Sequence, residues 1–426
     1  WSRKSYVWMP PGTRGRRLIF VSDPESRAMG WMIRTVVALA ALACAACGAD
    51  KAPNDRDKPG KHLTASATVL EAAVRHGMAA TQARGLAIAI VRDGTVSAVH
   101  TFGDRNETGD PLTADTVMYG ASLTKSAFAY MVLQLVDEGF IDLDTSIVDY
   151  LPEPLPTYEN EKPLYAPWDD LVADERWRKL TPRLLLAHSS GFHNYWFFEP
   201  DRTLRFHFDP GTRYAYSGDG YILLQFVLER SLGLDVGEEM RSRVFEPLGM
   251  TRTDMMWRDD FATDLADGWT MQGNAVAHDD RSKVRAAGSM DTTIADAGRL
   301  AAALVTCAQL SKIACEELTA PSMQITTASQ FPTLQDELPE GENRPDLAAG
   351  LGVITFSGPQ GPAFYKGGHD ESTGNTMVCV RNTRDCVVVL SNDVRAEASF
   401  PMIVRAVLSE TGVPWEWEYP TLELVK

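Results

Sequence analysis

The sequence of 426 residues has little positive charge and little histidine. It contains 41 Lys and Arg against 57 Asp and Glu, a formal net charge of −16, and only eight histidines. Proteins that bind nucleic acids neutralise phosphates with basic surface, so this balance argues against a nucleic-acid partner. The histidines are scattered and never take a spacing such as H-E-x-x-H. We therefore predict no metal and no other cofactor.

Motifs of several enzyme classes are also missing. The chain contains no G-x-S-x-G elbow, which argues against a Ser-His-Asp triad of the α/β-hydrolase type. It has no Gly-rich phosphate loop, so we do not expect a nucleotide ligand. The chain contains 44% hydrophobic and 23% charged residues, which is the composition of a globular protein with enough apolar residues to form a core.

The apolar stretch before Cys47 is too short to predict a membrane span. Residues 29–46 combine a basic start, an apolar run and small residues, which is typical of an export signal. Because Cys47 follows small residues and precedes a polar segment, we predict a lipoprotein-type signal with lipidation at Cys47. Cys44 is the weaker candidate, and an ordinary signal peptide or an uncleaved anchor is the alternative.

The predicted signal separates an upstream segment from a tether and a folded part. Residues 1–28 precede Met29 and carry several arginines without apolar periodicity, so we predict an upstream non-native segment there. Residues 47–63 are rich in Lys, Asp and Pro and are predicted to be a flexible tether. Residues 64–426 would form the folded part. The expected location is the cell envelope, with the membrane contacted through the lipid anchor only.

The remaining cysteines suggest two disulfides. Export to an oxidising compartment favours disulfide formation. Cys379 and Cys386 flank a short polar segment between two apolar runs, so a hairpin would place them opposite each other. Cys307 and Cys315 are close enough in sequence to form the second pair. Four cysteines allow three connectivities, and four buried thiols are the alternative.

Strand patterns lie at both ends of the chain. Two β-rich runs joined by Asp93-Gly94 predict a hairpin. The middle section, about 140–290, is mostly helical or irregular. The fold class that follows is α/β of the α+β type, one antiparallel sheet built from both chain ends and flanked by helices, with a mostly helical insertion. We predict strands at 86–91, 95–102, 351–356, 375–380 and 386–390, and helices at 64–84, 122–139 and 396–410.

Ser122-Leu-Thr-Lys125 opens the first strong helical pattern after that hairpin. Positions i and i+3 of a helix share a face, so the Ser122 hydroxyl and the Lys125 amine can converge. Serine is a weak nucleophile and needs an adjacent base, which Lys125 would supply. A single S-x-x-K is expected by chance in a chain this long, and the alternative is a helix-capping serine beside a solvated lysine.

Further sequence motifs decide between these two interpretations, because they occur in the same order as in one known protein superfamily. In that order the chain resembles the serine β-lactamase and penicillin-binding-protein superfamily, most closely its class C and esterase branch, over about residues 66–410. The resemblance implies a β-lactamase/transpeptidase-like fold. The phrases are Gly85 to Gly94, Thr116 to Lys125, Leu184-Leu-Leu-Ala-His-Ser-Ser-Gly191, Phe208-Asp-Pro-Gly211, Tyr216-Ser-Gly-Asp-Gly-Tyr221, Pro247-Leu-Gly-Met250 and Ala286-Ala-Gly288.

The resemblance implies that Tyr216 is the tyrosine of the Tyr-x-Asn element, which shuttles a proton between nucleophile and leaving group. We expect two neighbouring lysines to lower its pKa. Gly218 stands where the superfamily has Asn, whose amide binds a substrate amide. This departure favours an esterase or another acyl hydrolase over an enzyme for penicillin-like or peptide side chains.

Lys366-Gly367-Gly368 matches the Lys-x-Gly element on a strand beside the cleft. The resemblance implies that the glycines let substrate approach closely. It also implies that His369 gives its backbone N–H to an oxyanion hole together with the N–H of Ser122. A side-chain role for His369 is the alternative. His188 lies in a structural turn of the superfamily and is expected to be a packed, hydrogen-bonded histidine.

An aromatic cluster in the middle section is open to two interpretations, a wall of the substrate cleft or part of the core. It comprises Trp168, Trp177, Tyr195, Trp196, Phe197 and Phe198. The predicted activity is hydrolysis of a small ester, β-lactam or peptide substrate through an acyl-enzyme on Ser122. The alternatives are a penicillin-binding D-amino-acid peptidase and a cell-wall sensing module without turnover.

Overall fold

The computed structural model describes residues 59–159, 161 and 164–425. The predicted upstream segment 1–28, the signal 29–46 and the lipidation site Cys47 lie outside the described residues. Within the described part of the chain, no helix is both long and apolar enough to cross a membrane.

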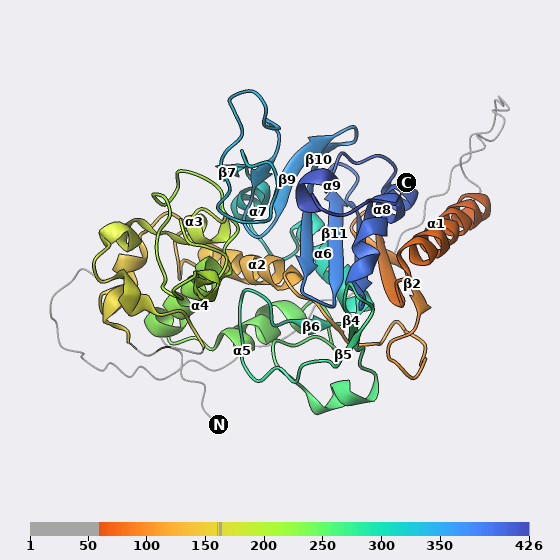
Figure 1. The fold of residues 1–426 in the computed structure, drawn as a ribbon, viewed down its shortest axis with the longest axis horizontal. Helices are drawn as coiled ribbons and strands as arrows, with labels where there is room; N and C mark the ends of the chain where they lie inside the picture. Colours follow the sequence, from red (N-terminus) through yellow and green to blue (C-terminus); the bar gives the residue numbers. More distant parts are fainter. Residues whose placement is uncertain (1–58, 160, 162–163, 426) are drawn as a thin grey trace, which may run out of the picture. The chain divides into compact units, whose positions relative to one another are not determined.

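One antiparallel sheet of eight strands forms the centre of the fold, in the order β2-β1-β12-β11-β10-β9-β8-β7 (Figure 1). Strand β1 pairs with β12, with Leu86 opposite Ser391, so the two ends of the chain lie side by side. This confirms the predicted sheet. The strands are β1 (Gly85–Arg92), β2 (Thr95–Gly103), β7 (Met323–Gln324), β8 (Ala348–Ala349), β9 (Ile354–Gly358), β10 (Gly361–His369), β11 (Gly374–Val380) and β12 (Asp385–Ser391).

Two tight connections hold this sheet in register. Asp93 and Gly94, between β1 and β2, have φ of 47° and 73°, and two positive φ values are what a type I′ hairpin turn requires. Strands β11 and β12 pair with Cys379 opposite Cys386, and a disulfide joins the two residues. The structure also joins Cys307 to Cys315.

Helices cover the sheet and form most of the remaining structure. Helix α6 packs against β1, β2 and β12, and α1 packs against α8. The contact of α6 is close because Gly298 faces Ala89, and a Cβ at residue 298 would lie 2.8 Å from the Ala89 Cβ. The helices are α1 (Pro59–Thr81), α2 (Leu123–Asp137), α3 (Pro182–Leu186), α4 (Gly218–Leu232), α5 (Val236–Met240), α6 (Ile294–Thr306), α7 (Lys312–Thr319), α8 (Phe400–Leu408) and α9 (Trp415–Glu418).

Several predicted boundaries were wrong. The helix predicted to end at residue 84 ends at Thr81, and the strand predicted from residue 351 begins at Ile354. The tether was predicted to extend to residue 63, but α1 begins at Pro59, and proline is well tolerated in the first turn of a helix. The predicted helix 396–410 is instead a 3₁₀ helix (Val394–Ser399) followed by α8. Pro401 lies in the first turn of α8, where its missing N–H has no helical partner to lose.

Helix α2 lies between the sheet and the middle section of the chain, with α3 and α4 on the side away from the sheet (Figure 1). It contacts β10 and β11, while its Phe128 ring lies 6.1 Å from the ring of Tyr221 in α4. The residues from Leu123 to Leu135 are all buried, since both sides of α2 are covered. The first turn of α2 therefore lies where the sheet and the middle section of the chain meet.

Two small sheets complete the described structure. They pair β3 (Met118–Tyr119) with β6 (Asp291–Thr292) and β4 (Gly268–Trp269) with β5 (Ala275–Val276).

Candidate active site

Ser122 precedes the first residue of α2, but its side chain does not cap the helix. The chain reaches it through Ala121, whose φ of 46° turns the backbone sharply. Lys125, one turn further along, has 0% of its surface exposed. The alternative interpretation of this motif, a capping serine beside a solvated lysine, is therefore wrong.

Hydrogen bonds bring three of the predicted residues together. The Lys125 Nζ donates to the Ser122 Oγ at 3.2 Å and to the carbonyl of Ala287 at 2.5 Å. The Tyr216 hydroxyl donates to the same Ser122 Oγ at 2.8 Å. Lys366 reaches this group from β10, with its Nζ 3.5 Å from the Tyr216 Oη. Residues almost 250 positions apart in sequence thus converge on one hydroxyl oxygen.

Burial shifts the pKa of both lysines, but to different extents. Burial, and then the charge of Lys366, hold the pKa of Lys125 well below its ordinary value. Burial also lowers the pKa of Lys366, to about 8, although Glu418 acts in the opposite direction. Lys125 is consequently the amine suited to accept a proton from Ser122, and Lys366 is the one that carries charge near neutral pH.

The prediction of a lowered pKa for Tyr216 was wrong. Burial raises the pKa of Tyr216 well above its ordinary value, with only the hydrogen bond to Ser122 opposing the shift. The phenol therefore starts as a proton donor rather than a phenolate. His188 stacks on its ring at a centroid distance of 4.2 Å and accepts a hydrogen bond from the Ser217 N–H at 3.1 Å. The predicted packed histidine is confirmed.

The glycines after Lys366 line the cleft, and they also leave room for neighbouring parts of the protein. A Cβ at Gly367 would lie 2.1 Å from the Glu418 Oε1. One at Gly368 would lie 3.0 Å from the backbone nitrogen of Ser122 and 3.1 Å from that of Leu123. Strand β10 thus runs directly against the turn that carries the candidate nucleophile.

His369 follows these glycines, and its backbone role in an oxyanion hole stays a prediction. Its side chain lines the cleft, 37% exposed, with Nδ1 3.2 Å from the Glu397 Oε1. Burial acts to lower the pKa of His369, but the hydrogen bond and charge of Glu397 outweigh it and the pKa lies above its ordinary value. An imidazole whose pKa is raised by Glu397 therefore lines the cleft together with Lys366.

Glu418 is a site residue that sequence reasoning missed. It comes from α9, is 4% exposed and accepts hydrogen bonds from the Tyr365 hydroxyl at 3.0 Å and the Gln330 amide at 2.9 Å. It also lines the same cleft as Ser122 and Lys366. Nothing in the local sequence distinguishes it from Glu416, which is exposed two residues earlier.

Replacing Glu418 by glutamine is expected to shift the pH profile. Because the carboxylate raises the pKa of Lys366, its removal should move that pKa below about 8. Protonated Lys366 is the charged group beside Tyr216, so the alkaline limb of kcat/KM should move to lower pH. The measurement is kcat/KM against pH, with Glu416→Gln as the matched control. An alkaline limb that stays in place in Glu418→Gln contradicts this role.

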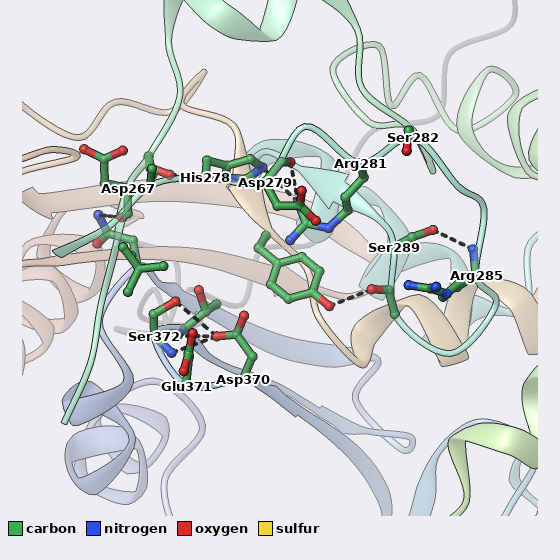
Figure 2. Close-up of a pocket in the computed structure, with 18 of the residues that line it drawn as sticks. Asp267, His278, Asp279, Arg281, Ser282, Arg285, Ser289, Asp370, Glu371 and Ser372 are labelled. Carbon is green, nitrogen blue, oxygen red and sulfur yellow. Dashed lines mark hydrogen bonds between the residues drawn. The ribbon is translucent and has the colours of Figure 1, made fainter. Parts of the chain in front are cut away.

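The residues converge on a cleft of about 440 Å³ that contains Ser122, Tyr216 and Lys366. A second hollow of about 490 Å³ adjoins it and shares Tyr119, Gly288 and Asp370 with it. Figure 2 shows this polar hollow, which Asp370 faces from the loop after β10 and Arg281 from the segment before β6. Among the described residues, no cluster of His, Cys, Asp and Glu could hold a metal ion.

Comparison with known proteins identifies a family that includes these site residues. A protein-family model described as Beta-lactamase matches residues 70–410, which include all four convergent side chains. The chain belongs to the beta-lactamase family. This relationship places it in the superfamily that contains β-lactamases and penicillin-binding proteins.

Individual relatives are distant. The chain is 26% identical over 209 residues to a D-aminopeptidase of Brucella anthropi, covering 44% of this chain and 36% of the relative. It is 31% identical over 187 residues to a lovastatin esterase of Penicillium rubens, covering 37% of this chain and 44% of the relative. The matches thus span less than half of these relatives.

Solved structures agree on the fold. An octameric penicillin-binding protein homologue from Pyrococcus abyssi superposes with a TM-score of 0.64 at 20% identity, over 83% of this chain and 79% of that one. At such identity the likeness shows the fold alone. The predicted mixed fold, a large antiparallel sheet flanked by helices, is confirmed.

Proposed function

We propose that this protein hydrolyses small esters through an acyl-enzyme, with Ser122 as the nucleophile. The observation that carries the proposal is the Ser122 Oγ, which accepts hydrogen bonds from both Lys125 and Tyr216. Serine hydrolases need a base beside the nucleophile, and an amine whose pKa burial holds well below its ordinary value is suited to that role. The same proposal includes the cell-envelope location and the lipid anchor at Cys47 predicted from the sequence.

The first half of the reaction forms the acyl-enzyme. As the Ser122 Oγ attacks the carbonyl carbon, its proton passes to the Lys125 Nζ. The oxyanion is stabilised by the backbone N–H groups of Ser122 and His369. The Tyr216 hydroxyl, next to Lys366, gives a proton to the leaving alcohol as the ester bond breaks, and recovers one from the Lys125 ammonium. Water then attacks the acyl group by the reverse sequence and restores Ser122.

Gly218 supports an ester over a β-lactam or peptide substrate, because the amide donor of related enzymes is missing there. A second candidate, a D-amino-acid peptidase, is supported by the D-aminopeptidase among the relatives. A sensing module that forms a stable adduct is less well supported, since such a module does not need all four convergent side chains.

The test combines turnover with intact-mass analysis of the protein incubated with p-nitrophenyl butyrate, nitrocefin and a fluorescent penicillin. We expect ester turnover, little β-lactam hydrolysis, and loss of both activity and adduct in Ser122→Ala. A stable penicillin adduct without turnover would support the penicillin-binding alternative. Ester turnover that persists in Ser122→Ala would show that the nucleophile is wrongly assigned.

A further inference from the structure

The first turn of α4 carries no side chain at position 218, and Tyr195 fills the space. A Cβ built on Gly218 would lie 2.4 Å from the Cε1 and Cζ of Tyr195 and 2.7 Å from its hydroxyl oxygen. A side chain at 218 and the ring of Tyr195 therefore exclude each other. The departure at Gly218 is thus a replacement, in which a phenol from another segment stands in the place of a short amide.

The backbone around Tyr195 is fixed to the start of α4. The Gly218 N–H donates to the carbonyl of Asn194 at 2.8 Å, and the Asp219 N–H donates to the same carbonyl at 3.0 Å. In return, the Trp196 N–H donates to the Asp219 carboxylate at 2.5 Å. Hydrogen bonds on both sides of Tyr195 therefore determine its position, so the ring is held over Gly218 before any substrate binds.

The ring continues into an aromatic wall that reaches solvent. Tyr195 stacks on Phe197 with centroids 5.0 Å apart and meets Phe198 edge to face at 5.8 Å. Phe198 is 55% exposed, although large apolar side chains are normally covered. Tyr195 and Phe198 both line the cleft of Ser122, and Phe331, 5.2 Å from the Tyr216 ring, also lines it.

These contacts point to a substrate class. We propose that Tyr195 and Phe198 are specificity-determining residues that select acyl groups with an apolar alkyl or aryl substituent, within the hydrolase proposed above. An apolar chain laid on this wall removes exposed aromatic surface from water. A substrate that carries an amide at this place would lose the hydrogen bond that an asparagine at 218 would have given, which costs affinity.

The experiment compares selectivity rather than activity. In Phe198→Ala, the ratio of kcat/KM for p-nitrophenyl butyrate to that for p-nitrophenyl acetate should fall about tenfold, the usual effect of losing contact with one or two methylene groups. In the double variant Tyr195→Ala/Gly218→Asn, the ratio of nitrocefin to butyrate turnover should rise about tenfold, because an amide donor returns to the cleft. Phe140→Ala, at a phenylalanine that is 44% exposed and outside the cleft lining, is the matched control and should change neither ratio.

The outcomes separate this inference from the proposed function. Active variants with unchanged ratios overturn the inference and leave the hydrolase intact. Absence of Ser122-dependent ester turnover in the unmodified protein overturns the proposed function and the inference with it. Phe198 is exposed, so its truncation removes little buried surface and the first ratio can be measured in a folded protein even if the double variant is unstable.

Discussion

Replacing Lys125 by methionine should reduce kcat/KM about 10³-fold or more while leaving the protein equally stable or more stable. The amine that accepts the Ser122 proton is lost, which removes general-base catalysis. The side chain has 0% exposure, and burial without a full set of partners is costly for an amine. Methionine has a similar length and no charge, so it fills the same space without that cost.

Two measurements on Lys125→Met test this expectation together: steady-state kinetics with p-nitrophenyl butyrate, and the midpoint of thermal unfolding. The control is Lys312→Met, which makes the same chemical change at a residue outside the cleft that is exposed and whose side chain is 90% accessible. It should leave both quantities unchanged. A Lys125→Met variant that keeps a tenth or more of the activity would remove Lys125 from the mechanism.

Replacing Gly368 by alanine should reduce kcat about 10²-fold to 10³-fold, the range seen when one oxyanion donor is lost. The added methyl group would lie 3.0 Å from the Ser122 nitrogen and 3.2 Å from the Gly120 carbonyl. These are backbone atoms that cannot rotate away, so strand β10 and the start of α2 must separate. The N–H groups of Ser122 and His369 then no longer point at one oxygen.

The matched control is Gly220→Ala, because its Cβ would meet its nearest neighbours at 3.5 Å and 3.6 Å, which is ordinary contact. Alanine in helix α4 should be tolerated and even mildly stabilising. Kinetics and circular dichroism of both variants distinguish a displaced strand from an unfolded protein. Full activity in Gly368→Ala would mean that the contact between β10 and the nucleophile turn has no role in catalysis.

Local patterns in the sequence were sufficient for much of the fold and for the centre of the site. The hairpin around Gly94 depends on neighbouring residues only, and the S-x-x-K motif depends on one turn of helix. The order of several family phrases then added Tyr216 and Lys366. The structure brings these residues together around Ser122.

What sequence reasoning missed depends on contacts between distant segments and on burial. Glu418 lies against Gly367, and Tyr195 lies over Gly218, and no spacing rule connects either pair. The sign of the Tyr216 pKa shift was wrong because burial dominates it, and a sequence does not show how deeply a ring is buried. For the same reason, the sequence could not show which residues of the aromatic cluster are buried and which line the cleft.

Trp168 and Trp177 of that cluster are 0% and 1% exposed and belong to the core. Tyr195 and Phe198 line the cleft instead. The core interpretation is therefore confirmed for the two tryptophans, and contact of Tyr195 and Phe198 with substrate stays a prediction.

The pairing of β1 with β12 also has a consequence for the order in which the newly made chain acquires its structure. The hairpin of β1 and β2 can form as soon as residue 103 is synthesised, but the other edge of β1 stays open until residues 385–391 are present. An open apolar edge invites pairing with other chains, and contacts of such long sequence separation slow folding. Lys366 and Glu418 also belong to the last part of the chain to be synthesised. A chain interrupted during translation therefore exposes the unpaired edge of an apolar strand at the stage when its cleft is still incomplete.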